Sequence, residues 1–139
     1  MPKKSEPVCG ANFFAYGTLQ LAEVMTGVTG RTFAGEAAVL EGFRRCAIRN
    51  EPYPGLREEP GGRTDGMLYR GLDVRSLAAL DAFEGVQYAR QQVQVQTADG
   101  RRHRAYVYVT APIFLNCLTD EEWDLAAFRE EHLDWRCSE

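Results

Sequence analysis

Histidine and cysteine are scarce in this sequence of 139 residues, which holds two of the first and four of the second. The cysteines lie far apart, unlike the dense set of a disulfide-stabilised mini-protein or the paired spacing of a zinc site. They are Cys9, Cys46, Cys117 and Cys137. His103 sits in an arginine-rich segment and His132 on one face of a predicted helix, so neither indicates a catalytic triad. We therefore expect reduced thiols and no metal site.

Long hydrophobic runs and an excess of positive charge are also lacking. The apolar run at residues 13–16 is too short for a signal peptide or a membrane span. A net charge of −4 and a pI near 5.3 disfavour binding to nucleic acid or anionic lipid. The motifs of phosphate loops, dinucleotide sites, hydrolase nucleophiles and zinc proteases are missing as well. We expect a cytoplasmic protein without nucleic-acid or membrane partners; the sequence leaves the oligomeric state open.

What is present is typical of a globular domain. Hydrophobic residues make up 45% of the chain and charged residues 26%, which suits a soluble protein with a sizeable core. The length fits one domain. We expect residues 1–10 to be a flexible N-terminal segment and residues 11–139 to form that single domain.

Strand and helix patterns are interspersed along the chain. Strands are predicted at residues 12–16, 31–40, 43–49, 63–69, 91–96 and 106–109. Helices are predicted at residues 19–26, at residues 74–84 and, from a capping box of Thr119 and Glu122, to about Leu133. The proline- and glycine-rich residues 50–62 are predicted to be a loop. Five or six strands with three helices favour an α+β domain with a mixed, barrel-like sheet.

The first candidate site is the junction where the strand at residues 12–16 runs through Gly17 and Thr18 into a helix. Such a junction directs free backbone N–H groups at one point, where a carboxylate or phosphate can bind, and glycine lets the ligand approach the backbone. The alternative is a tight turn in which Thr18 caps the helix. The local pattern leaves both interpretations open.

The second candidate is Glu84, which lies on the apolar face of the predicted helix at residues 74–84. At about 100° per residue it falls about 20° from Leu77 and about 40° from Leu80. Burial, the helix dipole at the last turn and the like charge of Asp81 would each raise its pKa. A glutamate with a raised pKa suits a general acid or base near neutral pH. Alternatively, the helix frays before Glu84 and the side chain reaches water.

Four short motifs, in order, resemble the gamma-glutamylcyclotransferase-like family over about residues 12–110. They are Tyr16-Gly17-Thr18-Leu19, Tyr53-Pro54-Gly55-Leu56, Gly66-Met67-Leu68-Tyr69, and Leu80-Asp81-Ala82-Phe83-Glu84-Gly85 followed by Tyr88. The sequence is similar to the branch that holds the avirulence-induced-gene type proteins and the gamma-glutamylamine cyclotransferases. The first ten residues and those from Asp120 onward carry no motif that aligns with the family.

The resemblance implies a small mixed β-barrel with flanking helices and a cavity at one end. It also implies that the loop of Tyr16, Gly17, Thr18 and Leu19 binds the glutamyl carboxylate through backbone N–H groups. Glu84 would be the catalytic glutamate, and Tyr88 would contact the substrate.

The implied reaction converts a γ-glutamyl amine or γ-glutamyl amino acid to 5-oxoproline and a free amine, with no cofactor. Glu84 would act as general acid and base, and the loop would hold either the substrate carboxylate or the developing oxyanion. Two other classes stay open: a small-molecule binding or regulatory protein with the same fold and pocket, and a protein-interaction module. The sequence does not identify the leaving amine.

Overall fold

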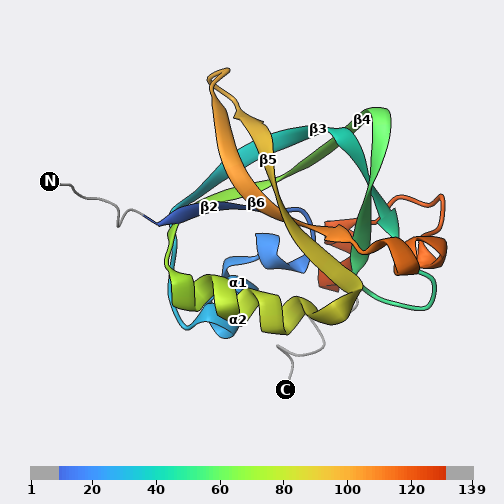
Figure 1. The fold of residues 1–139 in the computed structure, drawn as a ribbon, viewed down its shortest axis with the longest axis horizontal. Helices are drawn as coiled ribbons and strands as arrows, with labels where there is room; N and C mark the ends of the chain where they lie inside the picture. The colour runs from blue at the N-terminus through green and yellow to red at the C-terminus, as the bar shows by residue number, and fades with distance from the viewer. Residues whose placement is uncertain (1–9, 131–139) are drawn as a thin grey trace, which may run out of the picture.

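The computed structural model describes residues 10–130, and Figure 1 shows how their elements are arranged. The strands are β2 (Ala11–Ala15), β3 (Gly35–Ala47), β4 (Pro54–Leu72), β5 (Tyr88–Thr97) and β6 (Arg102–Thr110). The α-helices are α1 (Ala22–Thr29), α2 (Val74–Glu84) and α3 (Leu125–Phe128). Short 3-10 helices are η2 (Thr18–Gln20), η3 (Gly85–Gln87) and η4 (Pro112–Cys117). The predicted flexible segment lies outside the described residues except for Gly10.

The five strands close into a mixed barrel in the order β2-β4-β3-β5-β6. All pairs are antiparallel except β2 with β6, which run parallel where Phe13 faces Tyr106. Helices α1 and α2 pack together against one side of the barrel, below it in Figure 1. The predicted α+β class with a small mixed barrel and flanking helices is therefore confirmed. Among the helices of residues 10–130, none has the length and apolar character needed to cross a membrane.

The largest difference from the predicted elements is the long β3–β4 hairpin. The two strands predicted at residues 31–40 and 43–49 are one strand, β3, with a register shift between Glu41 and Phe43. Residues 50–53 lie outside the strands, as predicted for the loop at residues 50–62. For residues 54–62 the prediction is wrong, because β4 begins at Pro54. Pro60, Gly61 and Gly62 lie in a β-bulge opposite Gly42, which has a φ of 88°. Bulges use the same residue types as loops, so composition alone could not separate them.

The apolar residues form two cores on the two faces of the sheet. Phe14, Leu56 and Leu68 lie in the core inside the barrel. Phe13 and Leu80 belong to the core between the barrel and helices α1 and α2. Strand β2 is buried on both faces, which explains why its sequence is a continuous apolar run rather than an alternating pattern.

The ends of two predicted helices are also corrected. The helix predicted at residues 19–26 is a 3-10 turn, η2, followed by α1, because Leu21 is extended between them. The predicted capping box does not form. The Thr119 hydroxyl instead donates to the Ala47 carbonyl at 3.0 Å and accepts from the Glu121 N–H at 3.1 Å. Helix α3 begins later, capped by Asp124, and the predicted helix end at Leu133 lies outside the described residues.

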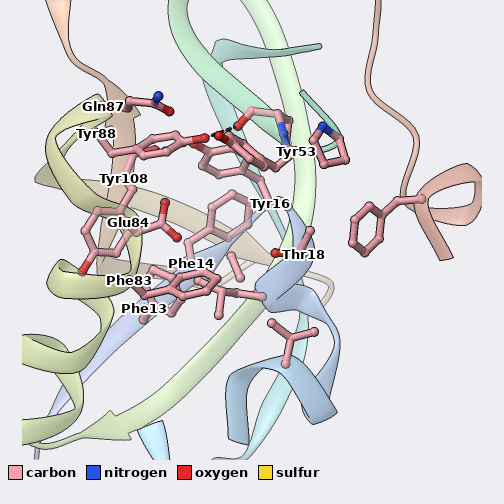
Figure 2. Close-up of a pocket in the computed structure, with 17 residues that line it drawn as sticks. Phe13, Phe14, Tyr16, Thr18, Tyr53, Phe83, Glu84, Gln87, Tyr88 and Tyr108 are labelled. Carbon is pink, nitrogen blue, oxygen red and sulfur yellow. Dashed lines mark hydrogen bonds between the residues drawn. The ribbon is translucent and has the colours of Figure 1, made fainter. Parts of the chain in front are cut away.

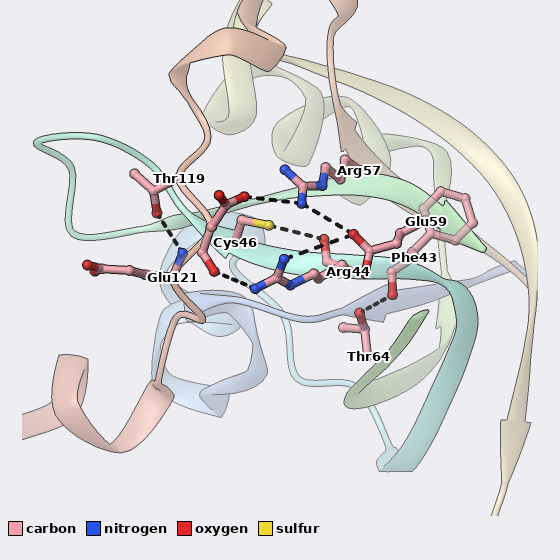
Figure 3. A network of polar contacts seen from close by, with 9 residues as sticks. Phe43, Arg44, Cys46, Arg57, Glu59, Thr64, Thr119 and Glu121 are labelled. Atoms are coloured by element: carbon pink, nitrogen blue, oxygen red, sulfur yellow. Dashed lines mark hydrogen bonds and ion pairs between the residues drawn. The ribbon is translucent and has the colours of Figure 1, made fainter. Parts of the chain in front are cut away.

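Charged side chains attach this C-terminal segment to the barrel, as Figure 3 shows. Arg57 forms ion pairs with Glu59 at 3.2 Å and with Asp120 at 3.6 Å. Arg44 donates to the Asp120 carbonyl. Backbone bonds add to this: the Ala47 N–H donates to the Glu121 carbonyl at 2.8 Å. The segment therefore continues the edge of β3 and carries α3 back over the end of the barrel.

Candidate active site

A pocket of about 430 Å³ lies at the end of β2, between α2 and the loop that follows β2. Its lining is mostly aromatic and apolar, with Glu84 on one wall and Thr18, which follows Gly17 in the loop, on the other (Figure 2). The tyrosines of the lining are Tyr16, Tyr53, Tyr88 and Tyr108. All six residues that we predicted as site residues line this one pocket. They are Tyr16, Gly17, Thr18, Leu19, Glu84 and Tyr88.

The loop wall is a tight turn built from backbone. Gly17 precedes η2 with a φ of −118° and a ψ of −136°, so it is not in the left-handed region. A Cβ at this position would lie 3.0 Å from the Pro54 side chain, so the need for glycine is steric. No side chain caps η2, which excludes the alternative of Thr18 as its N-cap. Among the described residues, no acceptor binds the N–H groups of Gly17, Thr18 and Leu19.

Side chains behind the loop hold its carbonyl groups. The Gln20 amide donates to the Tyr16 carbonyl at 2.9 Å and to the Gly17 carbonyl at 3.1 Å. The Tyr69 hydroxyl donates to the Leu19 carbonyl at 2.8 Å, and Arg45 donates to the Tyr16 carbonyl at 2.8 Å. None of these three side chains lines the pocket. Sequence reasoning assigned no site role to any of them. Arg45 and Tyr69 reach the loop from distant strands, which leaves no local pattern, and Gln20 lies just beyond the family motif that ends at Leu19.

Glu84 is the last residue of α2, and its carboxylate points into the pocket (Figure 2). The side chain is partly buried, and no described side chain forms an ion pair or hydrogen bond with it. Burial raises the pKa of Glu84 to about 7. The helix thus continues through Glu84, so the alternative of a frayed end is wrong. Its neighbour Leu80 is fully buried, which anchors this turn of α2 against the barrel.

Burial is the cause of the raised pKa of Glu84. Asp81, the like charge that we expected to add to it, is engaged elsewhere: its carboxylate accepts from the Tyr108 hydroxyl at 2.7 Å and pairs with Arg90 at 3.3 Å.

The two predicted tyrosines have their hydroxyl groups committed within the protein. Tyr16 is almost fully buried and donates to the Tyr108 carbonyl at 2.5 Å. Burial raises the pKa of Tyr16, with the nearby Tyr88 and Glu84 adding to the effect. Tyr88 donates to the Pro54 carbonyl at 2.7 Å. Each ring forms a wall of the pocket, and the role of both as substrate-binding residues stays a prediction.

The outer part of the pocket comes partly from two of the family motifs and partly from the segment that follows β6. Pro52 and Tyr53 lie on one side, and Phe128 of α3 on another. Trp123 joins them, because its indole N–H donates to the Pro52 carbonyl at 2.7 Å and its ring lies 5.9 Å from that of Phe128. Phe83 completes the rim with 51% of its surface exposed. Tyr53 and Phe83 lie in two of the family motifs, whereas Trp123 and Phe128 follow Asp120, where no motif aligns with the family.

The cysteines and histidine of the described part lie away from the pocket. Cys46 is buried in the β3 strand, where burial raises the pKa of its thiol, and Cys117 lies in η4. His103 is on the β5–β6 hairpin, 3.1 Å from the Thr97 hydroxyl. Across residues 10–130, no group of three or more metal-ligating side chains is gathered to hold an ion. Cys9, Cys137 and His132 lie outside the described residues.

A small barrel with an end pocket, in which backbone donors face one partly buried carboxylate, has the form of a small-molecule site. Residues 13–136 match the family described as gamma-glutamyl cyclotransferase, AIG2-like, and the chain belongs to that family.

Curated relatives support the assignment. AIG2-like protein C of Arabidopsis thaliana is 34% identical over 88 residues, which cover 63% of this chain and 51% of that protein. Protein AIG2 C of the same plant is 28% identical over 88% of this chain and 74% of its own length. The chain thus spans about half the length of the first relative and about three quarters of the second.

Solved structures share the fold. The solution structure of an Arabidopsis thaliana protein has a TM-score of 0.73 at 25% identity and covers 99% of this chain and 82% of its own. The crystal structure of an AIG2-like protein from Mus musculus has a TM-score of 0.65 at 28% identity. The match covers 82% of this chain and 88% of the mouse chain. A solved gamma-glutamyl cyclotransferase, 18% identical, shares the fold with a TM-score of 0.67 over 92% of this chain and 85% of that one.

Proposed function

We propose that this protein is a cyclotransferase that converts a γ-glutamyl amine or γ-glutamyl amino acid to 5-oxoproline and a free amine. The observation that carries the proposal is the carboxylate of Glu84, which has no partner among the described residues and shares one pocket with a loop whose backbone N–H groups have no acceptor there. Family membership supports the same reaction. A protein that only bound an anionic glutamyl group would gain nothing from a second negative charge in its pocket.

In the proposed mechanism the substrate supplies its own nucleophile. The α-ammonium first loses a proton to Glu84, and the resulting amine attacks the γ-carbonyl carbon. The new C–N bond closes the five-membered ring. Because the nucleophile is tethered, the protein has only to fold the glutamyl chain and to move protons.

Collapse of the tetrahedral intermediate breaks the bond to the leaving nitrogen. Glu84 delivers its proton to the leaving nitrogen, which departs as a neutral amine. The Glu84 carboxylate then takes the second proton from the ring nitrogen and passes it to the released amine, which leaves as an ammonium ion, so that Glu84 is again ionised. A carboxyl group with a pKa of about 7 can accept and return protons near neutral pH. The loop N–H groups would hold the substrate carboxylate or the developing oxyanion.

The leaving group would extend toward the rim formed by Tyr53, Phe83 and Phe128. These aromatic side chains offer apolar contact to an amine substituent. We therefore expect γ-glutamyl amines with apolar substituents to react faster than γ-glutamyl amino acids, whose carboxylate would lose its hydration against these rings.

The test is release of 5-oxoproline from a panel of γ-glutamyl amines, γ-glutamyl amino acids and glutathione. The proposal expects turnover of at least one member by the natural sequence and by a Glu41→Gln control, since Glu41 is 72% exposed on the barrel surface. Glu84→Gln should lower the rate of 5-oxoproline release by about 10²- to 10⁴-fold. If no member of the panel yields 5-oxoproline while 5-oxoproline itself binds, the protein is a binding protein and the proposal is wrong.

A further inference from the structure

Two side chains outside the pocket, Arg45 and Gln20, help to set which way the loop peptides face, together with the Gln20 backbone N–H, which donates to the Gly17 carbonyl at 3.1 Å. Both donate to the Tyr16 carbonyl, at 2.8 and 2.9 Å, and Gln20 also donates to the Gly17 carbonyl at 3.1 Å. Every described peptide bond is trans, so each N–H points opposite to the carbonyl before it. With both carbonyls turned toward side chains that do not line the pocket, the N–H groups of Gly17 and Thr18 face the pocket.

Contacts with Asp65 of the neighbouring strand β4 hold Arg45 in place. It comes from β3, and it also donates to the Asp65 carbonyl at 3.0 Å and pairs with the Asp65 carboxylate at 2.8 Å. Its side chain is only 12% exposed, and its buried Nε has no partner among the described residues. Burying a guanidinium with an unpaired N–H is unfavourable, which a purely structural contact could avoid with an apolar residue.

The charge of Arg45 is also directed at the loop. The Asp65 side chain is 79% exposed, so water screens its negative charge, whereas the guanidinium is largely buried beside the Tyr16 peptide. No lysine, arginine or histidine of the described residues lines the pocket. The Arg45 guanidinium thus brings a positive charge to the loop, at the Tyr16 carbonyl, from outside the pocket lining.

We infer that Arg45, together with Gln20, is a positioning residue that turns the Gly17 and Thr18 N–H groups toward the substrate's α-carboxylate. The inference rests on the proposed function for the identity of the ligand. It assigns the loop to the carboxylate rather than to the oxyanion, because the positive charge behind it is permanent and acts in the ground state as well as in the transition state.

The experiment compares two lactams that differ in a carboxylate, 5-oxoproline and 2-pyrrolidinone, by calorimetry or ligand-detected NMR. Arg45→Met should lower the affinity for 5-oxoproline about 10- to 100-fold, the scale of a shift of about 1 Å in a binding group. The affinity for 2-pyrrolidinone should not change. Arg45→Lys should recover part of the loss, because it keeps the charge but not the fork of donors. Arg63→Met, at a position 67% exposed, is the control.

A second variant keeps the test valid if Arg45→Met fails to fold. Gln20→Met removes one side-chain donor to each carbonyl at a partly buried position and should give a smaller loss of the same selective kind. In turnover, the loss should appear as a raised KM with kcat nearly unchanged, as for an interaction made equally in ground and transition states.

The outcomes separate this inference from the proposed function. Equal losses for the two lactams, no loss in a folded variant, or no binding of 5-oxoproline by the natural sequence would overturn the inference. If the natural sequence binds 5-oxoproline through Arg45 but releases none from any γ-glutamyl substrate, only the proposed function fails.

Discussion

The two walls of the pocket are built in opposite ways. The loop wall of Gly17 and Thr18 offers backbone N–H groups whose peptides are held from behind by neutral and positive side chains. The helix wall offers one side chain, Glu84, that no described residue holds. The first wall has no titrating group and stays the same at every physiological pH, whereas the second changes charge near pH 7. Under the proposed function, the loop wall would fix a ligand and the helix wall would move protons.

The two walls of the pocket also differ in the contacts that support them. Carbonyls of the loop are bonded by residues from η2, β3 and β4, so its geometry depends on the closed barrel. Glu84 depends on a single helix, whose end is set by Gly85 with a φ of 74° and a ψ of −165°, a conformation open almost only to glycine. The loop is thus tied to the sheet, whereas Glu84 projects from the end of a helix.

Glu84→Gln gives the largest expected effect, because it removes the only group on the helix wall that can exchange protons. The variant keeps the size of the side chain, so turnover should fall by about 10²- to 10⁴-fold, as for lost acid–base catalysis. Binding of 5-oxoproline should survive or improve, since its carboxylate meets no second charge. Rates of 5-oxoproline release and calorimetric affinities give the answer, with Glu41→Gln as the control. Activity within a few-fold of the natural sequence would disprove the mechanism.

Gly17→Val should damage the loop wall instead. A branched side chain at a position 3.0 Å from Pro54 blocks the approach to the N–H groups and pushes the loop away. We expect the affinity for 5-oxoproline to fall about tenfold or more, the loss of about one charge-assisted hydrogen bond. Gly27→Val, on α1 where a Cβ would meet nothing within 4 Å, is the matched control. Equal affinities in the two variants would place the anion site elsewhere.

The sequence predicted both walls, because each has a local signature. Glu84 was visible as a carboxylate at the helical spacing of Leu77 and Leu80, and the loop as a glycine between a strand and a turn. The barrel followed from strand count and the family motifs. These features depend on residues near one another in the chain, where periodicity and turn chemistry apply.

What the sequence could not predict depends on distant contacts. Residues 50–62 were assigned to a loop because a glycine-rich bulge within a long strand has the same composition as a loop. The roles of Arg45 and Tyr69 depend on strands that meet only when the barrel closes. The C-terminal segment was assigned to a helix from Thr119, whose hydroxyl is instead bonded to Ala47 of β3. Tertiary partners overrode the local capping preference.

The stability of the helix wall should depend on pH. The pKa of Glu84 is about 7 in the folded protein and near 4.5 when exposed, so the unfolded state loses its proton first as the pH rises. The folded state therefore loses stability between about pH 4.5 and pH 7, relative to a variant without this carboxyl group. At pH 8, Glu84→Gln should be more stable by about 1–2 kcal/mol, a value reduced for the water that reaches the pocket. At pH 4 the two should be equal.

Denaturant unfolding of both proteins at pH 4, 6 and 8 measures this difference. A constant difference across the series would mean that Glu84 is fully hydrated, and the contrast between the two walls would be lost.

We expect the smallest effect on turnover from removing metals or thiols. Neither described cysteine lines the pocket, and no cluster of metal ligands is found among the described residues. Cys46 is a buried core residue and Cys117 lies in η4. Turnover should stay within about twofold after chelation, and after replacing all four cysteines by alanine, since loss of a true catalytic group costs about 10²-fold or more. The Cys46→Ala change leaves a small cavity and should lower the melting temperature, so activity is compared well below the transition. A folded quadruple variant without turnover would show that a thiol acts in the reaction, and the two walls described here would then be incomplete.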